Sequence, residues 1–364
     1  MQNTVSKRQM VFILFVTLST SSVVTIPKTM ATSAQHGAWL TILIASLAFG
    51  AMAGLIVKLN QMNEGKMLYE YSRELTGKYV AFLIGVFYLA YFFTFSLFYC
   101  NSFDLLIKSS FLMKTPVWAM LLAGMPVYGV IAYKGIRNLG RLAEIIGLVF
   151  LVVTVILFIS MLLQGTFSFI LPLYNPADTG KYLIALKDTI EQFIGIEVLL
   201  VIPFIKAEKK MAKTAVLALI GFGLFYILDV YGCYAMIGMD EIVYHRFPLV
   251  DAIRLVEYQK IEFLQRLDIV YDTIGFMRVF LGKSALYLVI VELLCKMLPK
   301  VKRIVIVVIV GAAVTLASVV TIGIKDIMPK LITMLSVGGI VAAFLIPLML
   351  LVISKVKKNA QKNS

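Results

Sequence analysis

Residues 19–27, STSSVVTIP, and residues 195–203, GIEVLLVIP, each interrupt a long apolar segment. In both stretches a proline follows the first residue, Ser19 or Gly195, at a distance of eight positions. Small and polar residues at the middle of a membrane helix free backbone groups, which are tolerated only where they face protein, water or a ligand. The two stretches therefore predict discontinuous membrane helices at matching places in the chain.

The overall composition agrees with a chain made of membrane helices. Of the 364 residues, 60% are hydrophobic and 15% are charged, and the mean hydropathy is +0.93; a soluble domain carries about 25% charged residues. We therefore expect an all-α integral membrane protein rather than a soluble enzyme or a disordered chain. Segments long enough to cross about 30 Å of hydrocarbon give ten predicted spans: 9–34, 37–57, 79–109, 115–133, 142–164, 183–205, 212–239, 268–298, 303–324 and 329–354.

The formal net charge of +14 is explained by membrane topology. With an even number of spans, both termini lie on one side; 21 Lys and Arg flank the spans on that side and 11 flank them on the other. Positive residues gather at the cytoplasmic side, so both termini are expected in the cytoplasm and no nucleic-acid partner is expected. In the alternative interpretation, Lys7, Arg8, the apolar run 10–18 and the small residues at 31–34 form a secretory signal. Its removal would leave nine spans and undo the charge asymmetry.

The two interrupted spans begin two halves of five spans each, at about 9–164 and 183–354. Because the first spans of the halves run in opposite directions, we expect one domain with five-plus-five inverted repeats and a central binding site at the breaks. The helix start near Ser21 and Ser22 offers N–H donors to a carboxylate, and the carbonyls before each break suit an ammonium. An amino acid satisfies both. The alternative is that the hydroxyls bond back to their own helix and that Gly195 only permits close packing.

Ionisable residues inside the spans form a second pattern. Glu197 lies near the middle of span six, where a carboxylate must be protonated, paired or ligand-facing. We expect it to sense the ligand's amino group or a proton, with Lys283 or Arg278 of span eight as a compensating cation and Asp272 as a further coupling candidate. The alternative is a fixed structural ion pair among spans six, seven and eight. Tyr91 lies on a tyrosine-bearing face of span three that either lines a pocket or packs.

Signatures of enzymes and metal sites are missing from the sequence. It has no HExxH, CxxC or GxxxxGK[ST] pattern, and its three cysteines fall within predicted spans. We therefore expect no catalytic residues, no metal site and no cofactor. The amphipathic segment 247–265 between spans seven and eight predicts either an outer lid or partner surface, or a helix that lies in the membrane interface.

Four stretches of the chain resemble the endospore germination permeases, the B-type subunits of spore germinant receptors in the amino acid–polyamine–organocation transporter superfamily. They are QMVFILFVTLSTSSVVTIPKTMATSAQHGAWLTILIA (9–45), GIEVLLVIPFI (195–205), FPLVDAIRLVEY (247–258) and RLDIVYDTIGFMRVF (266–280). The resemblance implies residence in the spore inner membrane, assembly with an A-type subunit and a lipoprotein C-type subunit, and recognition of an amino acid or similar small nutrient that triggers germination.

The resemblance also implies where the ligand binds. Transferred by position, the site comprises Thr20, Ser21, Ser22 and Thr25 of span one and Gly195 and Glu197 of span six, with Tyr91 of span three facing them. The wider superfamily usually has glycines at the first break, where this chain has serine and threonine side chains that narrow the pocket. The same fold would serve a ligand-sensing subunit, a proton- or sodium-coupled amino acid transporter, or a channel-like conduit for ions or water.

Overall fold

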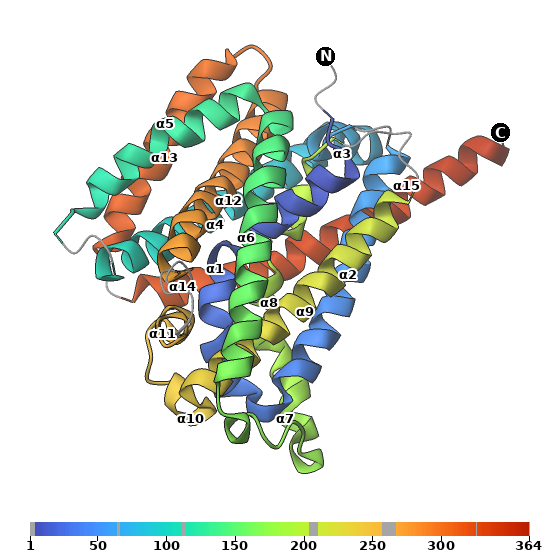
Figure 1. Ribbon diagram of the computed structural model, residues 1–364. Coiled ribbons are helices and arrows are strands. Elements are labelled where there is room, and N and C mark those ends of the chain that lie inside the picture. Colours follow the sequence, from blue (N-terminus) through green and yellow to red (C-terminus); the bar gives the residue numbers. More distant parts are fainter. Residues whose placement is uncertain are drawn as a thin grey trace.

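The chain folds as a bundle of helices, shown in the computed structural model of Figure 1. The structure describes residues 4–63, 66–110, 114–203, 210–256, 267–324 and 326–363. The helices that form the bundle are α1 (Lys7–Ser33), α2 (Ala38–Met62), α4 (Lys78–Ser110), α5 (Val117–Lys134), α6 (Ile136–Gln164), α9 (Met211–Ile237), α12 (Leu267–Met297), α13 (Arg303–Ile322), α14 (Ile327–Ile340) and α15 (Ile346–Asn363). Shorter helices connect them: α3 (Leu68–Thr76), α7 (Thr179–Ile184), α8 (Leu186–Phe193), α10 (Met239–Ile242) and α11 (Pro248–Arg254).

Most predicted spans are present as continuous helices. Within the described ranges, eight helices are long and apolar enough to cross a membrane, and α1 makes a ninth when its two bent halves are taken as one span. The predicted span 183–205 is divided among α7, α8 and the 3-10 helix η4 (Ile196–Leu200), none of which crosses a bilayer alone. The all-α multi-pass class is therefore confirmed, while the ten-span inverted repeat stays a prediction.

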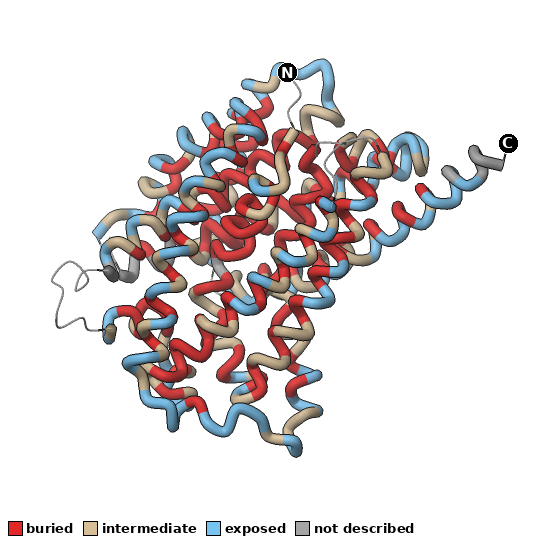
Figure 2. The backbone as a smooth tube through the Cα atoms, turned by 45° about the vertical axis from the view of Figure 1, so that its right-hand side comes forward, coloured by how far each residue is buried: buried red, intermediate tan, exposed pale blue. Residues whose placement is uncertain are grey.

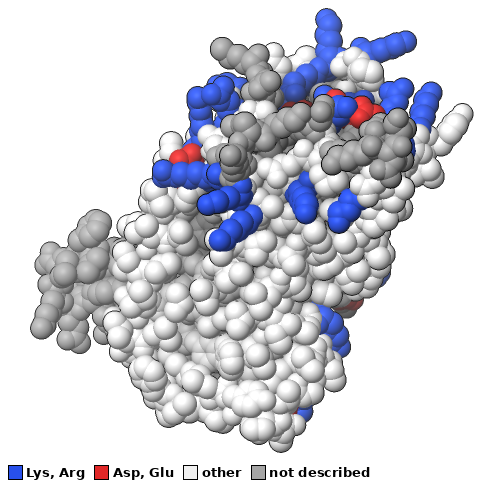
Figure 3. Space-filling model, turned by 90° about the vertical axis from the view of Figure 1, so that its right-hand side faces the viewer, with Lys and Arg blue, Asp and Glu red and all other residues white. Residues whose placement is uncertain are grey.

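Both chain termini lie at one end of the bundle, which we call the terminal end; α7 and α10 lie at the opposite, distal end (Figure 1). Figure 3 shows that on one face of the molecule most Lys and Arg side chains gather at the terminal end. This is the distribution that the positive-inside rule associates with a cytoplasmic surface. The orientation in the membrane remains a prediction.

The core of the bundle surrounds α1. This helix contacts α4, α6, α8, α9, α11 and α12, and Figure 2 shows the buried residues concentrated inside the bundle. Large apolar side chains on the outer helices stay exposed, for example Ile145 at 64%, Val308 at 62% and Leu316 at 67%. So much exposed apolar surface is tolerated where lipid covers it. The polar residues at the middle of α1, Thr17, Ser19, Thr20 and Ser22, are thereby enclosed by protein.

The turn between α5 and α6 is one residue long because Gly135 adopts a φ of +86°. This left-handed conformation is open to glycine without steric cost. As a result α6 begins at Ile136, earlier than the predicted start of span five at residue 142. The charged residues that suggested a loop, Arg137 and Arg141, lie on exposed positions of the first turns of α6.

The final span contains an irregular turn. Between α14 and α15, residues Val341–Leu345 form a π-helical turn, η6. Tyr88 of α4 donates its hydroxyl to the carbonyl of Ala342 at 2.7 Å, within this turn. Such single turns are rare and often lie at functional sites. Here the turn faces the helix that also carries Tyr91.

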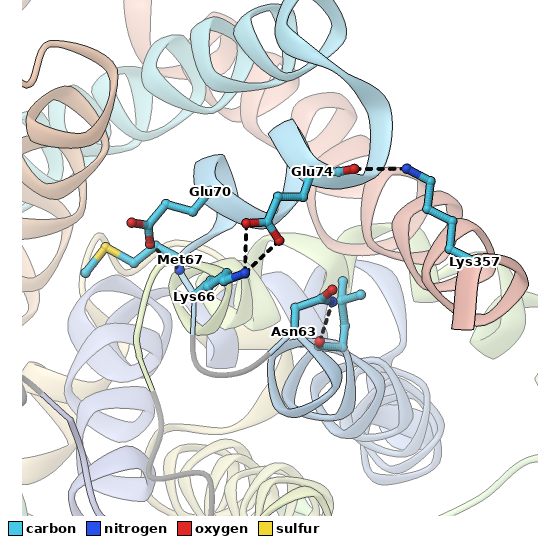
Figure 4. A network of polar contacts seen from close by, with 7 residues as sticks. Asn63, Lys66, Met67, Glu70, Glu74 and Lys357 are labelled. Carbon is cyan, nitrogen blue, oxygen red and sulfur yellow. Dashed lines mark hydrogen bonds and ion pairs between the residues drawn. The ribbon is translucent and has the colours of Figure 1, made fainter. Parts of the chain in front are cut away.

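A polar network at the terminal end holds α3 against α15 (Figure 4), and an ion pair of Glu70 holds α3 against α12. Lys66 pairs with the Glu74 carboxylate at 2.7 Å, and Lys357 of α15 donates to the Glu74 carbonyl at 2.9 Å. Glu70 pairs with Lys296 of α12 at 2.7 Å. These exposed or half-exposed pairs contribute little stability individually, about 0–1 kcal/mol. Together they fix the position of α3 on the terminal surface.

The amphipathic segment 247–265 is described only in part, because 257–266 lies outside the described residues. Its first portion forms α11, whose apolar side chains Leu249, Val250 and Ile253 are buried against the protein, with α1 and α9 as neighbours. A helix lying on the bilayer would instead leave these side chains to the lipid. For α11 the burial favours the lid interpretation.

Candidate functional site

The first predicted break is a bend rather than an unwound segment. α1 remains helical from Lys7 to Ser33, but its halves Lys7–Thr20 and Ser22–Ser33 meet at 56°. The side chain of Ser21 lies outside the described part of the structure. The expectation that backbone N–H and C=O groups are freed by unwinding at this point is therefore corrected.

Hydroxyl groups explain the bend. Ser19 Oγ donates to the Phe15 carbonyl at 2.5 Å, and Thr20 Oγ1 donates to the Val16 carbonyl at 2.6 Å. Serine and threonine that bond back one turn often bend a helix. The alternative foreseen from the sequence, hydroxyls bonding to their own helix, is thus confirmed for these two residues.

Side chains from neighbouring helices satisfy the carbonyls at the bend. The Tyr99 hydroxyl of α4 donates to the Thr17 carbonyl, and Arg278 Nη1 of α12 donates to the Ser19 carbonyl. Arg278 is only 3% exposed. The Thr17 and Ser19 carbonyls at the first break therefore already accept hydrogen bonds from the protein itself.

The second break is a true interruption. α8 ends at Phe193, Ile194 is extended with φ −60° and ψ 134°, and Gly195 has a φ of +124° before η4 begins. This φ strongly favours glycine. A Cβ at Gly195 would also lie 3.2 Å from Thr17 Cγ2 of α1. The break predicted at Gly195 is confirmed, and both backbone conformation and packing demand glycine there.

The two breaks are joined by hydrogen bonds to Gln192. Ser22 Oγ donates to the Gln192 carbonyl at 3.0 Å, and Thr25 Oγ1 donates to Gln192 Oε1 at 3.3 Å. The Tyr226 hydroxyl of α9 reaches the same Gln192 carbonyl at 3.3 Å. We call this contact between α1 and the end of α8 the junction. Sequence reasoning placed Ser22 and Thr25 but missed Gln192, whose signal was a polar side chain in the last turn before a break.

Glu197 lies just beyond the junction and is fully buried. Its Oε2 accepts a hydrogen bond from the Gly195 N–H at 2.7 Å. Its Oε1 has no hydrogen-bond partner in the described structure, and neither do Gln192 Nε2 and the Tyr91 hydroxyl. The Tyr91 hydroxyl lies beside the Glu197 carboxyl and interacts with it electrostatically. Three buried polar groups, one each from α4, α8 and η4, thus lack hydrogen-bond partners among the described residues.

α14 closes this region from another side through Gly339. A Cβ at Gly339 would lie 3.0 Å from Ile194 Cγ1 and 3.5 Å from the Tyr91 hydroxyl oxygen. The glycine therefore lets α14 approach the extended residue of the break and the predicted wall residue Tyr91 together. The structure brings Tyr91, Gly195 and Glu197 into one neighbourhood.

The predicted residues of α12 gather around the bend of α1. Arg278 and Asp272 line a cavity of about 30 Å³ together with Thr20 and with Val250 of the lid helix α11. Lys283 Nζ lies 4.8 Å from the centroid of the Phe103 ring. The contacts described for Glu197, in contrast, are with Gly195 and Tyr91. Among the described residues, no three His, Cys, Asp or Glu side chains are arranged to hold a metal ion.

A larger cavity, which we call the vestibule, opens at the distal end. Its volume is about 760 Å³, and its walls come from the distal half of α1, from α7 and α8, and from α14. Thr25 lies in its wall and bonds to Gln192 of the junction. Its charged lining consists of Lys28, Lys181, Lys187, Arg246, Asp188 and Glu191. The sequence did not reveal the vestibule because these residues come from separate segments.

Comparison with known proteins identifies relatives. Residues 4–327 match the family model described as "Spore germination protein". Spore germination protein YndE of Bacillus subtilis is 26% identical over 246 residues, 65% of this chain and 66% of that protein. Spore germination protein B2 of the same organism is 24% identical over 260 residues, 70% of this chain and 68% of that protein. The chain thus spans about two thirds of the length of these curated relatives.

Solved structures with a similar fold include MhsT and a manganese transporter. MhsT in complex with L-phenylalanine aligns with a TM-score of 0.68 at 14% identity, over 94% of this chain and 89% of MhsT. A mutant of the manganese transporter of Eremococcus coleocola aligns with a TM-score of 0.60 at 13% identity, over 95% of this chain and 77% of that one. At such low identity, these likenesses show a shared fold and nothing about ligand.

Proposed function

This chain belongs to the spore germination protein family, and from that premise we propose that it is the membrane-embedded B-type subunit of a spore germinant receptor. In this proposal the chain binds a small nutrient, an amino acid or similar molecule, and A-type and C-type partner subunits respond to the binding. It resides in the spore inner membrane with its terminal end in the cytoplasm. The halves 9–164 and 183–354 act as inverted repeats around the ligand.

The unsatisfied polar groups next to the junction carry this proposal. A buried polar group without a partner costs about 1–3 kcal/mol, so these three groups favour a ligand that completes their hydrogen bonds. Glu197 Oε1 and the Tyr91 hydroxyl can accept hydrogen bonds from an ammonium, and Gln192 Nε2 can donate to a carboxylate. An amino acid presents both groups a few ångströms apart.

The vestibule supplies a route to this site from the distal side. Four basic and two acidic side chains line it, so its field favours molecules that carry a carboxylate. Thr25 of the vestibule wall bonds to Gln192 of the junction. In this proposal a ligand carboxylate accepts from Gln192 Nε2 while Thr25 keeps its hydrogen bond to Oε1, so the ligand binds at the junction of α1 and α8.

The predicted site residues then take different parts. Thr20 shapes the bend of α1, while Ser22 and Thr25 hold the junction closed and Gly195 creates the break. Ser21 lies at the angle of the bend. Binding favours one arrangement of α1 relative to α8 and so shifts the populations of the two conformations. The partner subunits respond to this shift.

The test uses the purified chain in lipid nanodiscs and a panel of L-amino acids. We expect at least one of them to raise the melting temperature, because a ligand that binds only the folded protein stabilises it. Glu197→Gln should remove this effect, whereas Glu144→Gln, at an ion pair with Arg8 far from the junction, should retain it. A panel without effect on the wild type, or an unchanged response of Glu197→Gln, would contradict the proposal.

A second experiment distinguishes a protein that only senses the ligand from one that transports it. The same chain in liposomes is assayed for accumulation of the stabilising amino acid under proton and sodium gradients. We expect binding without accumulation. Gradient-driven uptake would establish a coupled transporter instead, and ion leak without uptake would establish a conduit.

A further inference from the structure

A groove on the outer side of the bundle takes no part in the proposed function. It lies between α5 and α13, which pack against each other at the edge of the bundle (Figure 1), and its volume is about 790 Å³. We propose that this groove binds one acyl chain of an anionic phospholipid, such as phosphatidylglycerol, whose phosphate is held by basic groups at the terminal end.

Apolar side chains that face the membrane form the walls of the groove. Leu122 of α5 and Val308 and Leu316 of α13 line it, and all three are exposed. The groove is open between these walls because Gly129 places no side chain into it. A Cβ at Gly129 would meet only Val307 Cγ1 among the described residues, at 3.6 Å. Hydrocarbon is the ligand that such walls favour.

The hydroxyl groups deep in the groove are already hydrogen-bonded within the protein. Tyr287 of α12 donates to the Val307 carbonyl, and Thr315 donates to the Gly311 carbonyl at 2.8 Å. Apart from these hydroxyls and two residues at the terminal end, the lining residues are apolar. The interior of the groove is therefore a site for an acyl chain rather than for a polar molecule.

The length of the groove matches one leaflet of a bilayer. The groove runs from Leu122 to Lys134 on α5 and from Ile304 to Leu316 on α13, about 18 Å in each case at about 1.5 Å per residue. One leaflet supplies half of the roughly 30 Å of hydrocarbon. A partner's membrane helix would cross the full thickness and extend beyond the groove, whereas one lipid chain that enters from the terminal end fills it.

Basic residues surround the terminal end of the groove. Lys134 lines it at the last turn of α5, and the exposed Lys300 and Lys302 precede α13. Arg303 holds the start of α13 beside α5, because its guanidinium donates to the Ala132 carbonyl at 2.6 Å. Basic pockets between membrane helices on the cytoplasmic side bind anionic lipid headgroups.

The two helices do not neutralise this charge themselves. Neither α5 nor residues 298–322 contain Asp or Glu, and Glu292 of α12 pairs with Arg303. The first turn of α13 also has no side-chain cap, so the positive end of the helix dipole faces the same region. The terminal end of the groove is thus complementary to a phosphate.

The experiment measures lipid binding to the purified, delipidated chain by native mass spectrometry, so it needs no nutrient and does not depend on the proposed function. Phosphatidylglycerol and phosphatidylcholine with identical acyl chains are titrated separately. We expect one phosphatidylglycerol to bind about tenfold more tightly or better, since each lysine near an anionic headgroup contributes about fivefold. Glycerol phosphate, a headgroup without acyl chains, should not compete at the same concentration.

Two pairs of variants locate the bound lipid. Ala312→Phe places a ring in the groove, whereas Ala313→Phe places the same ring at the next exposed position of α13, outside the groove. Lys134→Gln removes the charge of the groove, whereas Lys78→Gln removes an exposed lysine at the start of α4. Ala312→Phe should abolish the preference for phosphatidylglycerol, and Lys134→Gln should reduce it about fivefold. Both controls should retain it.

Equal binding of the two phospholipids would overturn the proposal and leave the groove to a partner's membrane helix. Binding that Ala312→Phe leaves unchanged, or competition by glycerol phosphate, would overturn it as well. If Ala312→Phe does not fold, a phosphatidylglycerol with a photoreactive group in its acyl chain decides with the wild type alone. We expect crosslinks to residues 122–134 and 304–316; crosslinks confined to other helices would place the acyl chain elsewhere.

Discussion

The two breaks share their spacing from a proline but differ in every structural respect. At the first, α1 bends by 56° and remains helical; at the second, the helix ends and Gly195 adopts a φ of +124°. At the first, Tyr99 and Arg278 occupy the carbonyls. At the second, Glu197 Oε1 has no partner within the described residues. The comparison teaches that equal spacing locates both breaks, while side chains from neighbouring helices decide which backbone and side-chain groups there are hydrogen-bonded.

The difference begins with the residues themselves. Ser19 and Thr20 carry hydroxyls that return to the carbonyls of their own helix and keep the chain helical. Gly195 has no side chain to do so, and its φ ends the helix. At the first break the Thr17 and Ser19 carbonyls accept hydrogen bonds from neighbouring helices, and at the second Glu197 Oε1 has no partner among the described residues.

The largest expected effect separates the open break from the filled one. Glu197→Gln removes the buried carboxylate that faces a ligand ammonium, so amino acid affinity should fall by about 100-fold, the equivalent of about 2–3 kcal/mol for a charge-assisted hydrogen bond. Calorimetric titration of the stabilising amino acid measures it. An affinity within threefold of wild type would show that the second break does not hold the ligand.

Next in size is the effect of Gly195→Ala on stability. A left-handed φ costs a side chain about 1–3 kcal/mol, and the new Cβ would press on Thr17 Cγ2. We expect a lower melting temperature in nanodiscs. Gly221→Ala is the matched control, since a Cβ there meets open space and alanine favours a helix by up to about 1 kcal/mol. Equal effects of the two substitutions would contradict the special conformation of Gly195.

A smaller effect tests whether the two breaks act as one unit. Ser22→Ala removes the hydrogen bond to the Gln192 carbonyl, which should cost about 1 kcal/mol of stability. Combined with Thr25→Ala, it should also increase hydrogen exchange at the end of α8. Unchanged exchange in the double variant would mean that α1 does not hold α8.

The smallest effect is expected at the first break. Ser19→Ala removes only a hydroxyl that returns to its own helix, and because such bonds slightly destabilise helices, stability should change by no more than about 0.5 kcal/mol. Amino acid affinity should remain at the wild-type value. A loss of affinity comparable with that of Glu197→Gln would place the ligand at the bend and reverse the comparison.

The sequence predicted the helical membrane class, both breaks and most spans, because apolar length and the glycine at 195 act locally. It did not predict that α1 bends without unwinding, since the groups that satisfy its carbonyls come from Tyr99 and Arg278, far away in the chain. Gln192 was missed for the same reason: its importance arises from hydroxyls on α1. The spacing of small and polar residues predicts where a helix is interrupted. Side chains from other helices determine how the groups at that interruption are hydrogen-bonded.

Polar residues in the spans were recognised as important, but their grouping was not foreseeable. Thr20, Asp272 and Arg278 share one small cavity beneath α11, while Glu197 lies with Tyr91 and Gly195. Depth in the membrane follows from position in a span. The direction in which each residue faces depends on the rotation of its helix about the helix axis. The length of an apolar segment does not determine this rotation.

The π turn η6 gives the last span two faces. An extra residue in a helix advances everything after it by about 100°, one residue's share of a 3.6-residue turn. α14, before this turn, contacts α4 and α8, whereas α15, after it, contacts α2 and α3. This rotation by one residue allows one span to place Gly339 against the buried break at one end. At its other end the same span places Lys357 at the terminal surface.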